Sequence, residues 1–252
     1  MSSLVKAGVS VALIMGCALS SAQAQDFSLG LTAGWSSKLY KDVDANKNNL
    51  VFPNIDYDAG GFWFHGLGAG YDLFQTPADR ISIVGYYMPL SLKASDSHSR
   101  AMRQLNNRRS TLMTGLSYAH ESQVLGKLES TVAVDSLDTS NGIHWNNSWS
   151  YPVQIGQLGI EPALGVNWND RKFNRYYYGI NSGEAQRSGF KKYSPGDSFT
   201  PYAEVNVNYT LTSSWNVYGG ARYTLLPNEV KNSPMIEKDS LLSLWTGVSY
   251  TF

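Results

Sequence analysis

The sequence predicts an all-β fold: a closed antiparallel transmembrane β-barrel of the bacterial outer membrane, with about 10 strands and 12 possible. Three observations lead to this expectation. The chain begins with an export signal, and its apolar residues recur at every second position. The connections between these stretches alternate between short and long, as in outer-membrane barrels.

The first 24 residues have the pattern of a secretory signal peptide. Lys6 supplies a positive charge, an apolar stretch covers 7–19, and "SSAQA" ends in small residues at Ala22 and Ala24. Such a segment is removed after export, here by cleavage near Ala24, and it is too short for a stop-transfer helix. We therefore expect a signal peptide over 1–24 and the barrel over 25–252.

The one cysteine, Cys17, lies inside the signal segment, so the mature chain must be stable without disulfides. The letters "IMGC" resemble a lipidation site, but the A-x-A site downstream fits ordinary cleavage better. Lysine and arginine together number 20, as do aspartate and glutamate, which gives no reason to expect a nucleic-acid partner. No long apolar run follows residue 24, so no membrane-spanning helix is expected in the mature chain.

Strands are expected wherever apolar and polar residues alternate, as in "FSLGLTAGWSSKL" and "QLGIEPALGVNWN". A helix cannot produce this period so often. The stretch 50–60 either extends a neighbouring strand or adds another, and 80–92 has apolar residues on both faces. The expected strands are 26–40, 62–73, 80–92, 108–120, 127–136, 142–154, 157–169, 198–210, 214–226 and 240–252.

The connections divide into two classes. The short ones are 75–79, 122–127, 156–157 and 212–214. The long ones, rich in Asn, Asp, Lys and Arg, are 41–61, 93–107, 137–141, 170–197 and 227–239. Short turns on one side and long loops on the other are typical of outer-membrane barrels, where only a closed sheet satisfies every backbone group in lipid.

Aromatic side chains at both ends of the expected strands favour the membrane barrel over a secreted β-sandwich, whose rings would gather at mid-strand. The expected membrane anchors are Trp35, Trp145, Trp168, Trp215, Tyr250 and Phe252. In the last strand, "SLLSLWTGVSYTF", a helical spacing competes with the two-residue period. As a strand it places Trp245 on the inner face, where we expect the ring to pack in the lumen.

Charged residues on the expected inner face form the candidate site. Two interpretations remain open: a buried network in which acids pair with Arg222, or a narrow channel with a charged constriction. A ten-strand barrel leaves little open space, which favours the network. The lumen residues are Glu129, Asp135, Glu161, Glu204 and Arg222.

Catalytic and cofactor sites are not expected. His98, beside Asp96, Ser97 and Ser99 on a long loop, is the only candidate for nucleophilic or acid–base work. Neighbours on a flexible loop rarely orient a catalytic base, so a solvated polar loop is the preferred interpretation. No metal-ligand spacing such as HExxH and no phosphate-binding glycine loop occurs, so no metal and no cofactor are predicted.

Basic residues gather in two of the loops. Arg100, Arg103, Arg108 and Arg109 lie within one short stretch, and the longest loop carries several more. On the outer surface they could pair with lipopolysaccharide phosphates, or they could simply keep the loops soluble.

Several long blocks closely resemble the MipA/OmpV family of Gram-negative outer-membrane proteins. They are "GFWFHGLGAGYDLF", "MRQLNNRRSTLMTGLSYAH", "VDSLDTSNGI", "FNRYYYGINSGEAQRSGFKKYSPGDSFTPYAEV" and "NSPMIEKDS". The resemblance spans nearly all of the mature chain. Asn232 in "NSPM" stands where we expect an acid in relatives, which puts a charge role for that loop in doubt.

The resemblance implies a non-enzymatic scaffold that links a membrane-bound murein lytic transglycosylase to a bifunctional murein synthase, a penicillin-binding protein. It brings no catalytic residues. The alternatives are a small-solute porin or a surface adhesin acting through the long loops. Murein enzymes lie in the periplasm, so contacts would use the short turns, the barrel rim or the residues near Gln25. These offer little of the roughly 800 Å² per partner of a standard interface, so we expect weak binding or additional docking on the membrane.

Overall fold

The computed structural model describes residues 26–43 and 49–252, so the expected signal peptide and its cleavage site lie outside the described residues. The strands are β1 Asp26–Ser36, β2 Leu50–Ala59, β3 Phe62–His65, β4 Gly68–Gln75, β5 Asp79–Met88, β6 Thr111–Ser122, β7 Gly126–Asp135, β8 Ile143–Ser150, β9 Val153–Ile155, β10 Leu158–Asn169, β11 Ser198–Thr210, β12 Trp215–Leu225 and β13 Ser240–Thr251. Between the strands lie three short helices, α1 Arg171–Tyr178, α2 Ser182–Ser188 and α3 Asn228–Lys231. The loops also contain two 3-10 turns, η2 Ala94–Asp96 and η3 Met102–Gln104.

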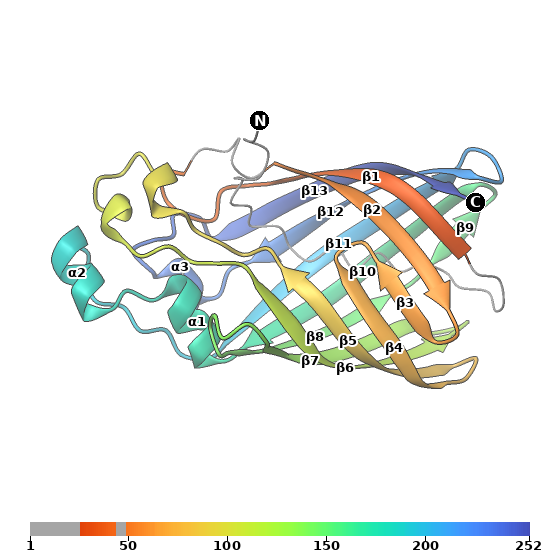
Figure 1. The fold of residues 1–252 in the computed structure, drawn as a ribbon, viewed down its shortest axis with the longest axis horizontal. Coiled ribbons are helices and arrows are strands. Elements are labelled where there is room, and N and C mark those ends of the chain that lie inside the picture. Colours follow the sequence, from red (N-terminus) through yellow and green to blue (C-terminus); the bar gives the residue numbers. More distant parts are fainter. Residues whose placement is uncertain (1–25, 44–48) are drawn as a thin grey trace.

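The strands form one antiparallel sheet that closes on itself (Figure 1). Strands that follow one another in the sequence pair, except for β8 and β9, and β1 pairs with β13. Strand β10 pairs with both β8 and β11. Both β8 and β9 pair with β10, so they are one wall strand interrupted at Tyr151 and Pro152. The thirteen strands therefore make a twelve-strand barrel, which confirms the predicted fold class.

The two additional strands come from the region between 50 and 75. The doubtful stretch 50–60 is a full strand, β2, so treating 41–61 as one long loop was wrong. The expected strand 62–73 is two strands, because the chain reverses at Gly66, whose φ is +56°. Glycine takes this left-handed backbone without the steric cost of a Cβ atom. The β3–β4 hairpin is therefore short and tight.

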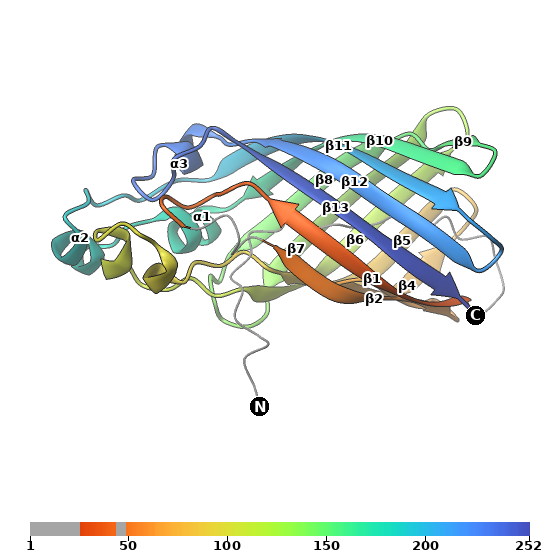
Figure 2. The same cartoon turned by 90° about the horizontal axis from the view of Figure 1, so that it is seen from above.

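The two ends of the barrel differ (Figures 1 and 2). The turn end carries the short connections and the C-terminus, and the loop end carries the helices. None of the helices in the described part of the chain is long and apolar enough to cross a membrane.

The outer face of the barrel is apolar. Trp35, Trp145 and Trp215 are more than a third exposed, although each is large and apolar. Leu31, Leu116 and Leu164 are each more than half exposed on three separate strands, β1, β6 and β10. Exposed apolar rows of this kind are what a lipid-facing surface requires. The other expected anchors, Trp168, Tyr250 and Phe252, share the parity of this outer face in their strands.

Large rings on the inner face lie over glycines of the adjacent strand. Trp245 is 6% exposed, as expected for a ring packed in the lumen. A Cβ atom on Gly220, its cross-strand neighbour, would lie 2.3 Å from the indole. Tyr202 covers Gly165 in the same way. The glycines thus make room for the rings that fill parts of the lumen.

The expected alternation of short turns and long loops fails at one place. The β3–β4 connection faces the loop end but consists only of Gly66 and Leu67. The hairpin pairs with β2 from Asp56 to Ala59, and no described strand pairs with residues 50–54 on the side away from β1. Among the described strands, residues 50–54 therefore pair with β1 alone, whereas β5 is paired with β4 as far as Tyr86.

Candidate functional site

The loops at the loop end fold into a packed cap instead of spreading into solvent. Met102, Tyr177 and Met235, from three different loops, are fully buried. The core that these loops share with the upper barrel consists of Leu39, Tyr40, Val84, Tyr86, Met88, Leu90, Leu92, Ala94, Met102, Leu105, Met113, Ala133, Phe173, Tyr177, Tyr178, Ile180, Leu226, Val230, Met235 and Ile236. These segments are therefore packed against one another, whereas His98, on the loop that was predicted to be solvated, is exposed.

Helix α1 supplies the aromatic part of the cap. The Asp170 side chain accepts a hydrogen bond from the Phe173 amide, which satisfies one of the free N–H groups at the helix start. The Tyr177 hydroxyl donates to the Arg109 carbonyl at 3.0 Å, and the Tyr176 hydroxyl accepts from the Arg109 amide at 2.9 Å. Burial raises the pKa of the Tyr178 phenol, so it stays neutral in the apolar core.

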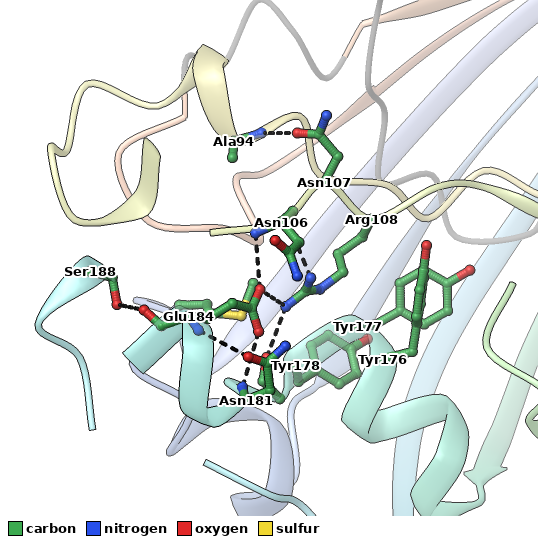
Figure 3. A network of polar contacts seen from close by, with 12 residues as sticks. Ala94, Asn106, Asn107, Arg108, Tyr176, Tyr177, Tyr178, Asn181, Glu184 and Ser188 are labelled. Carbon is green, nitrogen blue, oxygen red and sulfur yellow. Dashed lines mark hydrogen bonds and ion pairs between the residues drawn. The ribbon is translucent and has the colours of Figure 1, made fainter. Parts of the chain in front are cut away.

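One buried ion pair joins two loops of the cap (Figure 3). An Arg108 Nη2 atom lies 2.8 Å from Glu184 Oε1, and these side chains are 6% and 1% exposed. The same nitrogen donates to the Gly179 carbonyl at 3.0 Å, and the Asn106 amide donates to Glu184 at 2.9 Å. A buried pair with this many additional hydrogen bonds fixes the register of the two loops.

Glu184 also belongs to the start of α2. Asn181 and Glu184 form a reciprocal capping box, in which each side chain accepts from the other residue's backbone N–H. Burial alone would raise the pKa of the Glu184 carboxyl. The Asn181 and Asn106 amides and the Arg108 guanidinium outweigh burial, so this pKa lies below its ordinary value.

The lowered pKa makes the cap acid-sensitive. At a pH between the two pKa values, the Glu184 carboxyl binds more protons in the unfolded state than in the folded state. The ionised carboxyl therefore stabilises the fold fully at a pH above the unfolded pKa. This stabilisation is lost as pH falls through the lower, folded value. We expect the melting temperature of the tyrosine signal in near-ultraviolet circular dichroism to fall with acidification. The Glu184→Gln variant should lose part of this dependence, and an unchanged pH profile would contradict the assignment.

Beneath the cap the lumen contains a cavity of about 180 Å³. Its apolar lining residues Leu39, Met88, Leu90 and Leu241 lie toward the loop end, where the polar His144, Asn169 and Thr224 also line it. The polar lining consists of Glu129, Thr131, His144, Asn146, Ser148, Ser150, Glu161, Asn167, Asn169, Thr200, Tyr202, Glu204, Asn206, Arg222, Thr224 and Ser243. The cavity is therefore lined by both apolar and polar residues, with Glu129 and Glu161 nearer the turn end and Arg222 nearer the loop end.

Four of the five expected lumen residues line this cavity. Arg222 forms an ion pair with Glu204, and its guanidinium carbon lies 4.2 Å from the centre of the Tyr202 ring. Glu129 pairs instead with Lys127 at 2.7 Å. Glu161 has no ion-pair or hydrogen-bond partner recorded among the described residues. The acids thus do not form one network around Arg222, and one carboxylate is left facing the cavity.

Asp135 does not line the cavity. Its carboxylate accepts hydrogen bonds from the Thr111 hydroxyl and from the amides of Leu137, Thr139 and Asn141. It therefore shapes the β7–β8 loop, whose Asp138 and Asn141 both have positive φ. The sequence indicated an inward-facing acid at this position but not that it lies at the loop end.

The loop around His98 is held by backbone and side-chain contacts. The His98 amide donates to the Asp42 carbonyl at 2.9 Å, and the Ser97 hydroxyl donates to the Lys41 carbonyl at 3.2 Å. Asp96 lies 3.3 Å from the Lys93 ammonium. These contacts tie the β1–β2 and β5–β6 loops together.

Sequence reasoning missed the cap residues Arg108 and Glu184. The capping-box spacing of "NSGE", Asn181 to Glu184, was visible and would have placed a helix start inside the longest loop. The sequence does not indicate that Arg108, and not one of the neighbouring arginines, is the buried one, because its burial depends on the folded loops.

A closed barrel with an apolar outer face, a polar lumen and loops gathered at one end defines an outer-membrane β-barrel protein. The chain belongs to the family described as MltA-interacting protein MipA, whose profile matches residues 29–252.

The chain also matches individual proteins in sequence and in fold. The chain is 43% identical to the MltA-interacting protein of Escherichia coli (strain K12), over 99% of this chain and 98% of the relative. It is 34% identical to the putative outer membrane protein YiaT of the same strain, over 93% and 94% of the two chains. Among solved structures, the NanC porin matches with a TM-score of 0.48 and 10% identity, covering 89% of this chain and 100% of that one.

Proposed function

We propose that this protein is an outer-membrane scaffold that binds a membrane-bound murein lytic transglycosylase at its turn end and links it to a penicillin-binding murein synthase. The observation that carries the proposal is the 43% identity, over nearly the whole chain, to a protein named for its interaction with MltA. The proposed role needs no catalytic group and no cofactor, only a surface that faces the periplasm.

The turn end supplies such a surface. Val124 and Leu125, at the tip of the β6–β7 turn, are 79% and 62% exposed. Leu211 in the β11–β12 turn and Ile155 before the β9–β10 turn are at least half exposed. The Leu125 carbonyl accepts a hydrogen bond from the Trp149 indole at 2.6 Å, which holds this tip in place. Exposed apolar tips on rigid turns are suited to anchor a partner.

The test is capture of the transglycosylase by the purified mature protein in detergent. A variant with Val124, Leu125 and Leu211 changed to serine should capture several-fold less enzyme than the wild type. The matched control changes Lys191 and Lys192 at the loop end to serine and should leave capture unchanged. Full capture by the turn variant, with loss in the loop variant, would contradict the proposed surface.

A small-solute channel is the second candidate, because the lumen contains a cavity lined by polar, charged and apolar residues. The packed cap over that cavity favours the scaffold, since solutes entering from the loop end would have to displace it. Stepwise currents through the wild-type protein in planar bilayers would favour the channel instead.

A further inference from the structure

The loop end of the barrel carries an excess of positive charge. Its two longest loops, 89–110 and 170–197, contain eleven Lys and Arg residues but four Asp and Glu, although the whole chain has 20 of each class. Some of these cations have partners, as Arg171 has in Asp197 at 3.4 Å. Arg109, Lys172 and Arg175 are exposed and form no ion pair within the described part of the chain.

Helix α1 has one buried face and one charged face. Its buried residues are Phe173, Asn174, Tyr177 and Tyr178. With about 3.6 residues per turn, these four lie on one side of the helix, and Lys172 and Arg175 lie together on the other. Phe173 and Tyr178 line the lumen cavity. The two cations therefore face away from the lumen.

A third cation is fixed beside this charged face. The Arg109 amide donates to the Tyr176 hydroxyl at 2.9 Å, and the Arg109 carbonyl accepts from the Tyr177 hydroxyl at 3.0 Å. Tyr176 directly follows Arg175, so Arg109 lies next to the last turn of α1. The Tyr176 hydroxyl accepts one hydrogen bond here and keeps its own hydrogen for another acceptor. We call Arg109, Lys172, Arg175 and Tyr176 the rim patch.

The rim patch lies at the level of the lipid headgroups. Trp145 and Trp168 are cross-strand neighbours near the loop ends of β8 and β10, and tryptophan rings favour the membrane interface. Helix α1 begins three residues after Trp168, which spans at most about 11 Å. The Asp170 amide donates to the Ile143 carbonyl at 3.1 Å, so the start of the helix is held on β8.

The carboxylates around the patch are engaged elsewhere. Asp170 accepts from the Phe173 and Ile143 amides, and Asp135 accepts from amides of the β7–β8 loop. An outside anion is therefore needed to balance the three cations. Arginine binds phosphate through two parallel hydrogen bonds, and a phosphate monoester carries about −1.5 to −2 charges. A zwitterionic phosphodiester lipid offers one negative charge, which its own amine neutralises.

We propose that the rim patch binds the phosphate monoester of a membrane lipid in the outer leaflet, which the long loops of such barrels face. Arg109 and Arg175 donate to the phosphate oxygens, Lys172 adds a positive charge, and the Tyr176 hydroxyl donates a further hydrogen bond. Binding holds α1, and with it the cap, against the membrane surface. The inference does not depend on the scaffold role, which uses the opposite end of the barrel.

The first test counts, by native mass spectrometry, the molecules of lipid A that stay bound to the full mature protein in detergent. Lipid A is a glycolipid with phosphate monoesters. The variant Lys172→Gln/Arg175→Gln should retain several-fold less of it than the wild type. The matched control, Lys191→Gln/Lys192→Gln, removes the same charge directly after α2, the helix farthest from the barrel wall (Figures 1 and 2). Equal retention by all three proteins, or equal loss in both variants, would overturn the proposal.

The second test identifies the group that is bound. Lipid A without its phosphates, and phosphatidylcholine, should be retained by the wild type no better than by the rim variant. Inorganic phosphate at the same concentration should not displace lipid A, and displacement would overturn the assignment to a lipid. Arg175→Lys keeps the charge but loses the planar fork, so its retention should lie between those of the wild type and the rim variant. Full retention of lipid A without phosphates would overturn the phosphate assignment.

Discussion

Replacing Glu184 with alanine is expected to destabilise the cap by about 3–5 kcal/mol, because breaking a buried ion pair leaves the other charge without compensation. Arg108 is 6% exposed, so water cannot replace the lost carboxylate. The loss also removes the hydrogen bond from the Asn106 amide and half of the capping box with Asn181. The two loops that Glu184 joins should then separate at a lower temperature.

The measurement is thermal melting of the tyrosine signal in near-ultraviolet circular dichroism, with proteolysis of the loops as a second readout. Lys93→Ala is the matched control, because it breaks a pair in which the lysine is 50% exposed and should cost at most about 1 kcal/mol. The double variant Arg108→Met/Glu184→Met should be more stable than Glu184→Ala, since it leaves no unpaired charge. Wild-type melting of Glu184→Ala would disprove this role for the pair.

Replacing Arg222 with methionine is expected to weaken the barrel wall by a comparable amount, about 3–5 kcal/mol, for the same reason. The Glu204 side chain is only 5% exposed and would remain in the lumen without its cation. The stacking of the guanidinium on the Tyr202 ring would be lost as well. Glu161 lines the same cavity and adds a further negative charge.

This loss can be followed by the temperature at which the compact, fast-migrating form disappears on a gel. Arg222→Lys keeps the positive charge but cannot reproduce the planar fork, so it should be destabilised less than Arg222→Met. Adding Glu204→Gln to Arg222→Met should restore part of the stability. An Arg222→Met protein that converts at the wild-type temperature would show that the pair does not stabilise the wall.

Much of the barrel could be predicted from local pattern. Alternation in "FSLGLTAGWSSKL" places Trp35 outside, and the same parity in the last strand places Trp245 inside, because successive side chains of a strand point to opposite faces. The inward orientation of Glu129, Glu161, Glu204 and Arg222 follows from the same rule. The strand count between 50 and 75 did not follow, because a tight reversal at Gly66 leaves the alternation almost unbroken.

The sequence by itself determined the class of fold, the two faces of the wall and four charges that line the lumen cavity, because each depends on the spacing of neighbouring residues. Only the tertiary structure decided which charges pair, which strand lies beside each part of β2 and that the loops form a cap. These features depend on contacts between distant segments: Arg108 lies 76 residues from Glu184 along the chain, and no local pattern records that contact.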